Sequence, residues 1–302
     1  MTEQKKNLVA ELLAERLGKL IEKDESVWKK PWVCLGSDKN ILSHRHYRGI
    51  NALILPLVRD ERGFNSIMWG TFQQWLERKT PVRKGEKGTR IIFWKPLTYQ
   101  NEVKNDAGET ELEEREVFMA RCYTVFNGSQ CEGYDVSAEN KFKPLDDKRN
   151  KEADKYFDNY GIPIIYGGDS AFYVPSKDEI HLPEWERFNT ASEFYSTLAH
   201  ESIHSTGAKH RLDRKFKLDN EQMNYAIEEL VADIGAGLLV GKFGYAYQFS
   251  DNNIAYLKSW FRSLKNEPKL LIKACSHAQK AVDYLDKVTE FKEADADTAS
   301  NN

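Results

Sequence analysis

The hydrophobic and polar positions of the first half of the chain change period after the N-terminus. Residues 5–23 place Leu, Val, Ala and Ile at helical spacing between charges, which predicts an amphipathic helix. Aromatic and β-branched runs follow, and two of them, RIIFWKPL at 90–97 and EVFMARCYTVFN at 116–127, predict β-strands. The polar stretch at 101–115 between them contains an Asp-Ala-Gly turn signal and predicts an exposed hairpin loop or insertion.

The second half of the chain has a mainly helical pattern. Apolar residues recur three to four positions apart in five stretches, which predict helices near 151–161, 190–206, 219–240, 252–266 and 268–290. The stretch 162–184 differs, because short apolar runs there are broken by Gly-Gly and Ser-Lys-Asp, which predicts short strands joined by turns.

A polar, poorly patterned stretch at 128–150 marks the expected linker between two domains. The chain has 302 residues, which is enough for two cores of ordinary size. We therefore expect a two-domain α+β protein, with an N-terminal α/β domain at 1–140, a second domain at 150–290 and a disordered acidic tail at 291–302.

Composition indicates a folded cytoplasmic protein. Hydrophobic residues make up 40% of the chain, which is too many for a disordered protein. The four cysteines lack C-x-x-C spacing, which argues against a cysteine metal site, and their small number suggests a reducing compartment. No apolar run is long enough for a signal peptide or membrane span, so we expect no membrane partner.

The segment TLAHESIHSTG at 197–207 contains the pattern H-E-x-x-H. Residues four apart share one face of a helix, so His200 and His204 can bind the same metal ion. Glu201 can then act as general base toward a water molecule that attacks a carbonyl. Asn189 or Thr190 can cap this helix, and Gly207 can end it. These features favour a metal site over a chance pattern in a charged helix.

A catalytic zinc ion needs a third protein ligand and one open position. The following helix offers Glu229, with Asp233 four residues later as a hydrogen-bond partner behind a histidine ligand. Glu228 is the alternative ligand, about 100° around the helix. Zinc is the expected cofactor for two histidines and a carboxylate, although manganese, cobalt or another divalent metal suits the same ligands.

The residues around this motif leave two roles open. The segment SAFYVPSKDEIHLPE predicts either an exposed edge strand that binds an extended peptide or an ordinary core hairpin. In the first case Tyr173 or His181 would face the cleft. His210 would either stabilise an oxyanion or lie at the surface.

A strong charge asymmetry is hidden by the net charge of −3. Residues 28–95 contain fourteen lysines and arginines and five acidic residues, a net charge of +9, together with five of the seven tryptophans. Basic groups bind phosphates and aromatic faces stack on bases, which favours a single-stranded nucleic acid as partner over a duplex. The alternative is that the tryptophans form a core and the charges a solvated face.

The candidate nucleic-acid contacts combine tryptophans with basic residues, and several of them lie in PVRKGEKGTR, a segment that contains two glycines. They are Trp28, Lys30, Trp32, Arg45, Arg48, Trp69, Trp75, Arg83, Lys84, Lys87 and Arg90. The segment lacks P-loop spacing, and no helix-turn-helix or zinc-finger spacing is present.

Several stretches taken in order resemble the ArdC family of plasmid antirestriction proteins. They are WKKPW, YRGINALIL, WGTFQQW, VRKGEKGTRIIFW, VFNGSQCEG, HESIH and EELVAD. The resemblance implies an N-terminal domain that binds single-stranded DNA and a C-terminal zincin-like metallopeptidase domain. It also implies protection of incoming conjugative plasmid DNA from restriction enzymes, with His200, His204 and Glu229 on the metal and Glu201 as base.

Two other functions remain open at this point. One is a protein that coats single-stranded DNA and whose metal domain is catalytically silent. The other is a replication or primase accessory protein, although the sequence holds no nucleotide-binding or polymerase motif. A protein substrate for the second domain is expected only if that domain is an active peptidase.

Overall fold

The computed structural model describes most of the two predicted domains. The described residues are 35–104, 110–139, 148–216, 218, 220–247 and 268–290, with the backbone alone for 94–104, 110–120 and 268–269. Several sequence predictions lie outside this part of the chain, namely the helices at 5–23 and 252–266, the tail at 291–302, and Trp28, Lys30 and Trp32.

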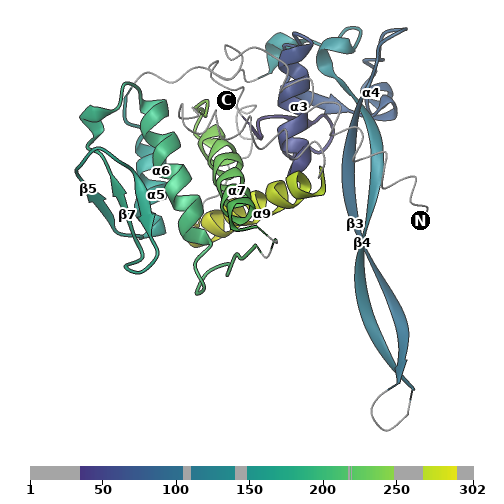
Figure 1. Cartoon of the computed structure of the whole chain (residues 1–302). Helices are drawn as coiled ribbons and strands as arrows, with labels where there is room; N and C mark the ends of the chain where they lie inside the picture. Colours follow the sequence, from purple (N-terminus) through teal and green to yellow (C-terminus); the bar gives the residue numbers. More distant parts are fainter. Residues whose placement is uncertain are drawn as a thin grey trace.

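The N-terminal part is built on a four-stranded sheet of order β1-β2-β4-β3 (Figure 1). Its strands are β1 (Lys39–Asn40), β2 (Met68–Gly70), β3 (Thr89–Lys104) and β4 (Thr110–Asn127). β1 pairs with β2 in parallel, and the other two pairs are antiparallel. Both predicted strands are therefore confirmed.

The two faces of this sheet are covered by different helices. On one face, apolar residues of α3 (Ile50–Glu61) share a core with Ile91 and Val125. Phe126 follows Val125 and so points to the opposite face, where it packs beside Trp75 of α4 (Phe72–Glu77). The sheet is thus the middle layer of the N-terminal part.

The hairpin of β3 and β4 extends far beyond the rest of the sheet (Figure 1). Its register runs without interruption from Thr89 opposite Val125 to Lys104 opposite Thr110. The expectation of a loop at 101–115 is therefore wrong, because only 105–109 lies between the two strands. The two strands pair with each other through alternate backbone groups along this whole register, although the sequence of the outer part is polar.

The first part of the predicted linker at 128–150 belongs to the N-terminal part of the structure. Short 3-10 helices at Gly128–Gln130 and Val136–Ala138 follow β4 directly. The buried Glu139 carboxylate accepts a hydrogen bond of 2.7 Å from the backbone N–H of Ile67, beside β2. Residues up to 139 thus pack on the N-terminal sheet despite their polar sequence, and the domain boundaries themselves stay predictions.

Within the described residues, the C-terminal part combines four α-helices with a three-stranded sheet of order β5-β7-β6. Its elements are α5 (Lys151–Tyr160), β5 (Ile164–Tyr166), β6 (Phe172–Val174), β7 (Glu179–Leu182), the 3-10 helix Trp185–Arg187, α6 (Ala191–Thr206), α7 (Glu221–Lys242) and α9 (Pro268–Val288). The predicted helices and short strands of this region are confirmed where the structure describes them.

Local signals define the ends of these helices. The Asn150 side chain accepts hydrogen bonds from the first turn of α5, and Gly161 ends that helix in the left-handed conformation at φ 73°. Thr190, rather than Asn189, caps α6 by accepting a hydrogen bond from the backbone N–H of Glu193. Gly207 ends α6 in a right-handed conformation.

Helices α6 and α7 approach closely because of a glycine. A Cβ atom placed on Gly235 would lie 2.9 Å from Cδ1 of Ile203, so any side chain at this position would force Ile203 or the helices to shift. Ile203 is followed by His204, and Gly235 lies two turns after Glu228. The close contact therefore brings together the two helix segments that carry the candidate metal ligands.

Helix α9 packs against both parts of the chain, on α6 and α7 and also on α3. Arg48 at the start of α3 forms an ion pair with Asp283, and the backbone N–H of Gly49 donates to the Gln279 side chain. Among the described helices, none combines the length and apolar character needed to cross a membrane.

Candidate functional site

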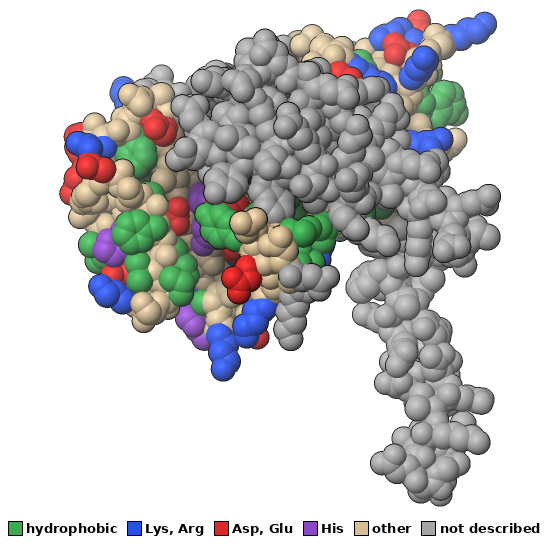
Figure 2. Space-filling view, in the orientation of Figure 1, with side chains coloured by type: hydrophobic (Ala, Val, Ile, Leu, Met, Phe, Trp, Pro, Cys, Tyr) green, Lys and Arg blue, Asp and Glu red, His purple; other side chains and the backbone are tan. Residues whose placement is uncertain are grey.

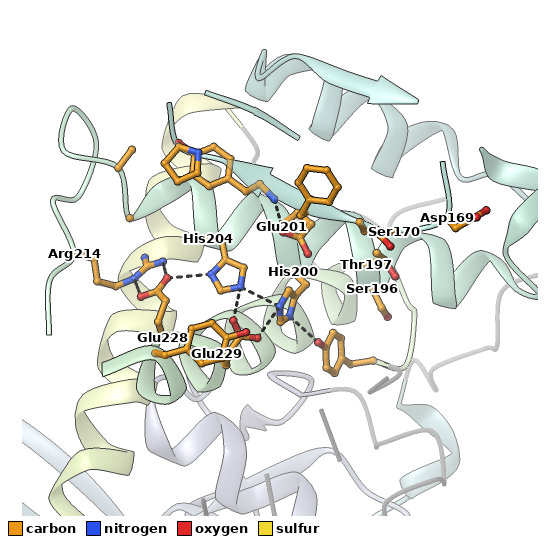
Figure 3. A pocket seen from close by; sticks show the side chains of 18 residues that line it. Asp169, Ser170, Ser196, Thr197, His200, Glu201, His204, Arg214, Glu228 and Glu229 are labelled. Carbon is orange, nitrogen blue, oxygen red and sulfur yellow. Dashed lines mark hydrogen bonds and ion pairs between the residues drawn. The ribbon is translucent and has the colours of Figure 1, made fainter. Parts of the chain in front are cut away.

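Two histidines and one glutamate converge in the C-terminal part. His200 and His204 lie one turn apart on α6, and their Nε2 atoms are 3.1 Å apart. Glu229 of α7 places its carboxylate oxygens 3.5 Å from His200 Nε2 and 3.4 Å from His204 Nε2. Figure 3 shows the three side chains pointing toward one another from the two helices.

This arrangement fits a divalent metal ion. The three ligand atoms lie within 4.8 Å of one another, and no other such group occurs among the residues that the structure describes. Two imidazole nitrogens bound to one tetrahedral ion would be roughly 3.3 Å apart, close to the observed separation. Two nitrogens and a carboxylate oxygen also leave a fourth position open.

A buried carboxylate and a tyrosine orient His200. Nδ1 of His200 lies 3.0 Å from Asp233 Oδ1 and 3.3 Å from the Tyr247 hydroxyl. The Tyr247 hydroxyl in turn donates to Asp233 Oδ1 at 2.6 Å. Asp233 thus lies behind His200, and its contact with Nδ1 directs Nε2 toward the ligand cluster. Tyr247 was not predicted from the sequence, because it lies outside the motif.

A different pair of residues orients His204. Its Nδ1 lies 3.2 Å from Glu228 Oε1, and the buried Arg214 donates to both oxygens of Glu228. Arg214 also donates to the carbonyl of Ile203 near the end of α6. The structure therefore places Glu228 outside the ligand cluster, because one position along α7 turns its side chain to the far side of the imidazole. Sequence reasoning missed Arg214, whose only signal is the basic run after Gly207.

The charges of the site depend on one another. Burial alone would lower the pKa of His200, but hydrogen bonds to Asp233 and Glu229 outweigh it and raise that pKa to about 10. Burial opposes ionisation of Glu229, yet its two histidine partners hold its pKa well below the usual range. The pKa of Glu228 falls to about 2, since Arg214 and His204 outweigh burial. A divalent cation can therefore replace the protons of two imidazoles.

Glu201 lies beside the ligand cluster in the same cleft. The cleft has a volume of about 850 Å³ and is lined by Glu201, the three clustered residues and Tyr173, among others. The backbone N–H of Tyr173 donates to Glu201 Oε2 at 2.8 Å. Tyr173 belongs to β6, which is an edge strand of its sheet. The sequence thus correctly placed Tyr173 and an edge strand next to the motif helix.

Two other histidines do not line this cleft. His181 bonds to Glu179 at 2.9 Å and stacks on Phe172 with the ring centroids 4.8 Å apart. His210 lies 3.2 Å from Asp178, with 61% of its side chain exposed. Of the alternatives left open by the sequence, the structure favours Tyr173 over His181 at the cleft and a surface position for His210, because both histidine side chains contact carboxylates outside the cleft.

Two of the candidate DNA-stacking residues belong to the core. Trp69 and Trp75 are completely buried. The indole N–H of Trp69 donates to Asp38 at 2.6 Å, and that of Trp75 donates to the carbonyl of Phe126 at 2.9 Å. The prediction that these two side chains stack on DNA bases is therefore wrong, since their apolar rings and polar groups both find partners inside the protein.

The basic candidates divide by their partners. Arg83 bonds to Glu86 and to the carbonyls of Ser129 and Cys131, so it holds its own loop in place. Arg48 is paired with Asp283. The remaining candidates in the described chain are exposed, namely Arg45, Lys84, Lys87 and Arg90. Figure 2 shows several Lys and Arg side chains near the corner of the molecule that carries α4.

Two family models divide the chain in agreement with this architecture. Residues 7–126 match the N-terminal domain of anti-restriction factor ArdC, and residues 151–277 match a zincin-like metallopeptidase. The fold and the site thus define a two-domain protein that carries a zincin-like metallopeptidase domain. Together with the relatives described next, they show that the chain belongs to the ArdC antirestriction family, as the sequence resemblance predicted.

Solved structures and curated relatives cover most of the chain. It is similar to the metal-free crystal structure of the antirestriction ArdC protein from plasmid R388, with 35% identity, a TM-score of 0.73, and 93% of this chain and 98% of that chain covered. The Mn(II)-bound structure of that protein gives 32% identity and a TM-score of 0.71, with coverage of 92% and 97%.

Two curated proteins complete the comparison. The uncharacterized protein y4eC of Sinorhizobium fredii is 32% identical over 269 residues, which are 88% of this chain and 87% of that protein. The DNA primase TraC of Escherichia coli is 32% identical over 298 residues, which span 91% of this chain but 27% of the primase.

Proposed function

We propose that this protein binds single-stranded DNA and protects incoming conjugative plasmid DNA from restriction in the cytoplasm of the recipient cell. We further propose that its second domain is a metallopeptidase. The observation that carries the second proposal is the convergence of His200, His204 and Glu229 beside Glu201 in one cleft. Family membership and the charge of +9 in residues 28–95 support the first.

In this proposal His200, His204 and Glu229 hold the metal. A divalent ion there would polarise the carbonyl of the scissile bond and lower the pKa of the attacking water. Zinc is the proposed ion, with manganese or cobalt as alternatives, and the relative bound to Mn(II) supports a divalent cation in general.

The chain's own residues would perform the proton transfers and hold the substrate. Glu201 accepts a proton from the attacking water and delivers it to the leaving amine. The Tyr173 N–H fixes the Glu201 carboxylate at the wall of the cleft. β6 is an edge strand, and its main-chain groups other than the Tyr173 N–H can pair with an extended peptide, so a protein substrate is the proposed partner of this domain.

The substitution Glu201→Gln tests whether catalysis matters for antirestriction. Glutamine keeps the size and a hydrogen-bond acceptor for Tyr173 but cannot take up the proton. We expect loss of protection in a conjugation assay into a restricting host, with unchanged metal content and thermal stability. Retained protection would instead support the alternative in which the protein coats DNA and the metal domain is catalytically silent.

A second candidate function follows from the match to a DNA primase. The match spans 27% of TraC, so this module also occurs within a much larger replication protein. A replication or primase accessory role would require the chain to stimulate primer synthesis on a single-stranded template. Protection from restriction without any effect on priming would exclude that role.

A further inference from the structure

Two aromatic side chains are exposed at the base of the long hairpin. Phe93 of β3 is 49% exposed, and Tyr123 of β4 is 41% exposed. Their ring centroids are 5.6 Å apart, and the ring planes meet at 89°. They therefore form an edge-to-face pair in contact with solvent, unlike the buried Trp69 and Trp75.

The strand register places this pair on a known face of the sheet. Phe93 is directly opposite Arg121, and Tyr123 is directly opposite Ile91. Facing residues of neighbouring strands, and residues two apart in one strand, share a face, so all four side chains lie together. Ile91 is buried in the core that α3 covers. The aromatic pair thus lies on the same face of the sheet as Ile91, further along the hairpin that Figure 1 shows extending from the sheet.

Positive charge accompanies the two rings. Arg121 is exposed and stands across the hairpin from Phe93. The chain segment that includes β3 up to Lys95 carries the net charge of +9. A guanidinium beside exposed aromatic faces is the combination that binds unpaired nucleotides, because bases stack on the rings while the cation contacts a phosphate. Paired bases in a duplex do not present their faces to such rings.

We propose that Phe93, Tyr123 and Arg121 form the contact surface for single-stranded DNA. Bases stack on the two rings, and Arg121 binds the backbone phosphate between them. This inference rests on the proposed DNA-binding function and assigns it to specific residues. It replaces the buried tryptophans, which sequence reasoning had selected, with aromatic residues that are accessible.

The opposite face of the same sheet provides a matched control. Phe72 at the start of α4 is 54% exposed, close to the value of Phe93. Its ring contacts Phe126, with the centroids 6.3 Å apart. Phe126 and Tyr123 are three residues apart in β4 and therefore point to opposite faces. Phe72 thus has the same chemistry and exposure in the same domain but lies on the other side.

The experiment measures fluorescence anisotropy of a labelled oligothymidylate with the full-length protein over a range of salt. We expect Phe93→Ala and Tyr123→Ala each to weaken binding by roughly 5- to 100-fold, whereas Phe72→Ala binds like the unmodified protein. Phe93→Trp retains a stacking face and should retain binding. Arg121→Gln should reduce the slope of log affinity against log salt by about 0.7.

The possible outcomes distinguish a failure of the proposed DNA-binding function from a failure of the assignment to this surface. If the unmodified protein does not bind the oligothymidylate, the DNA-binding function itself fails. If it binds and the alanine variants at Phe93 and Tyr123 bind equally well, the function stands and this surface is wrong. An equal loss for Phe72→Ala would also overturn the assignment to this face. Circular dichroism and metal content of each variant show that it is folded.

Discussion

At the scale of single residues, the two histidines of the cluster are oriented by unlike partners. Asp233 and Tyr247 hold Nδ1 of His200, whereas Glu228 holds Nδ1 of His204 and is itself held by Arg214. In both histidines Nδ1 contacts a carboxylate, so Nε2 faces the other candidate ligands. The neighbours Glu228 and Glu229 therefore have different roles, although both are glutamates on one helix.

The role of Glu228 can be tested through metal affinity. Glu228→Gln should weaken metal binding by about 10- to 100-fold, because an amide orients His204 less strongly than a carboxylate does. Isothermal titration with Zn²⁺ or Mn²⁺ measures the change. Glu221→Gln, an exposed change in the first turn of the same helix, serves as the control. Equal affinities for the two variants would contradict this role.

The buried Asp38 predicts an unusual dependence of stability on pH. Burial raises its pKa from 3.8 to about 6, although Arg59 and the Trp69 N–H oppose the shift. The folded state thus binds a proton more tightly than the unfolded state, and this group destabilises the fold above pH 6 but not below pH 4. Relative to Asp38→Asn, the unmodified protein should gain roughly 3 kcal/mol between pH 7 and pH 4.

Urea unfolding of the two proteins at a series of pH values checks this prediction. The asparagine variant keeps the shape of the side chain but has no proton to exchange in this range. The difference between the two free energies of unfolding therefore isolates Asp38 from the other titrating groups. A difference that does not change with pH would show that Asp38 ionises normally in the folded protein.

At the scale of elements, the contact of α6 with α7 positions the candidate centre. Gly235→Ala forces a methyl group against Ile203, which should destabilise the protein by about 1–3 kcal/mol and weaken metal binding as the helices separate. Gly237→Ala is a suitable comparison, because its Cβ would meet Leu35 instead of α6. Thermal unfolding and metal titration of both variants check this. Equal metal affinity in the Gly235 and Gly237 variants would contradict it.

The elements themselves could be predicted where local signals were strong. Gly161 and Thr190 mark helix ends through local signals within a few residues, so α5 and α6 could be predicted from the sequence, whereas the Asn150 cap was found only in the structure. The outer part of the β3–β4 hairpin was not predicted, because these strands pair with each other and their polar sequence shows no apolar face. The polar sequence at 101–115 has no clear hydrophobic period to detect.

At the scale of the whole molecule, the features that could not be predicted from the sequence depend on contacts between residues far apart in the chain. The spacing of His200, His204 and Glu229 was sufficient to predict that they converge, since each lies on a well-marked helix. Trp69 gave no comparable signal, because the partner of its buried indole N–H is Asp38, thirty-one residues away. Composition indicated aromatic and basic character in the N-terminal part, but only the register showed that Phe93, Tyr123 and Arg121 share one face.

The metal content of the purified protein tests the central claim most directly. Inductively coupled plasma mass spectrometry after saturation with Zn²⁺ or Mn²⁺ and removal of free ions should give one ion per unmodified chain. Glu229→Gln and His204→Ala should each bind far less metal, while the exposed Glu221→Gln should bind as the unmodified protein does. Stoichiometric metal in the Glu229 and His204 variants, or none in the unmodified chain, would contradict a metal centre at these residues.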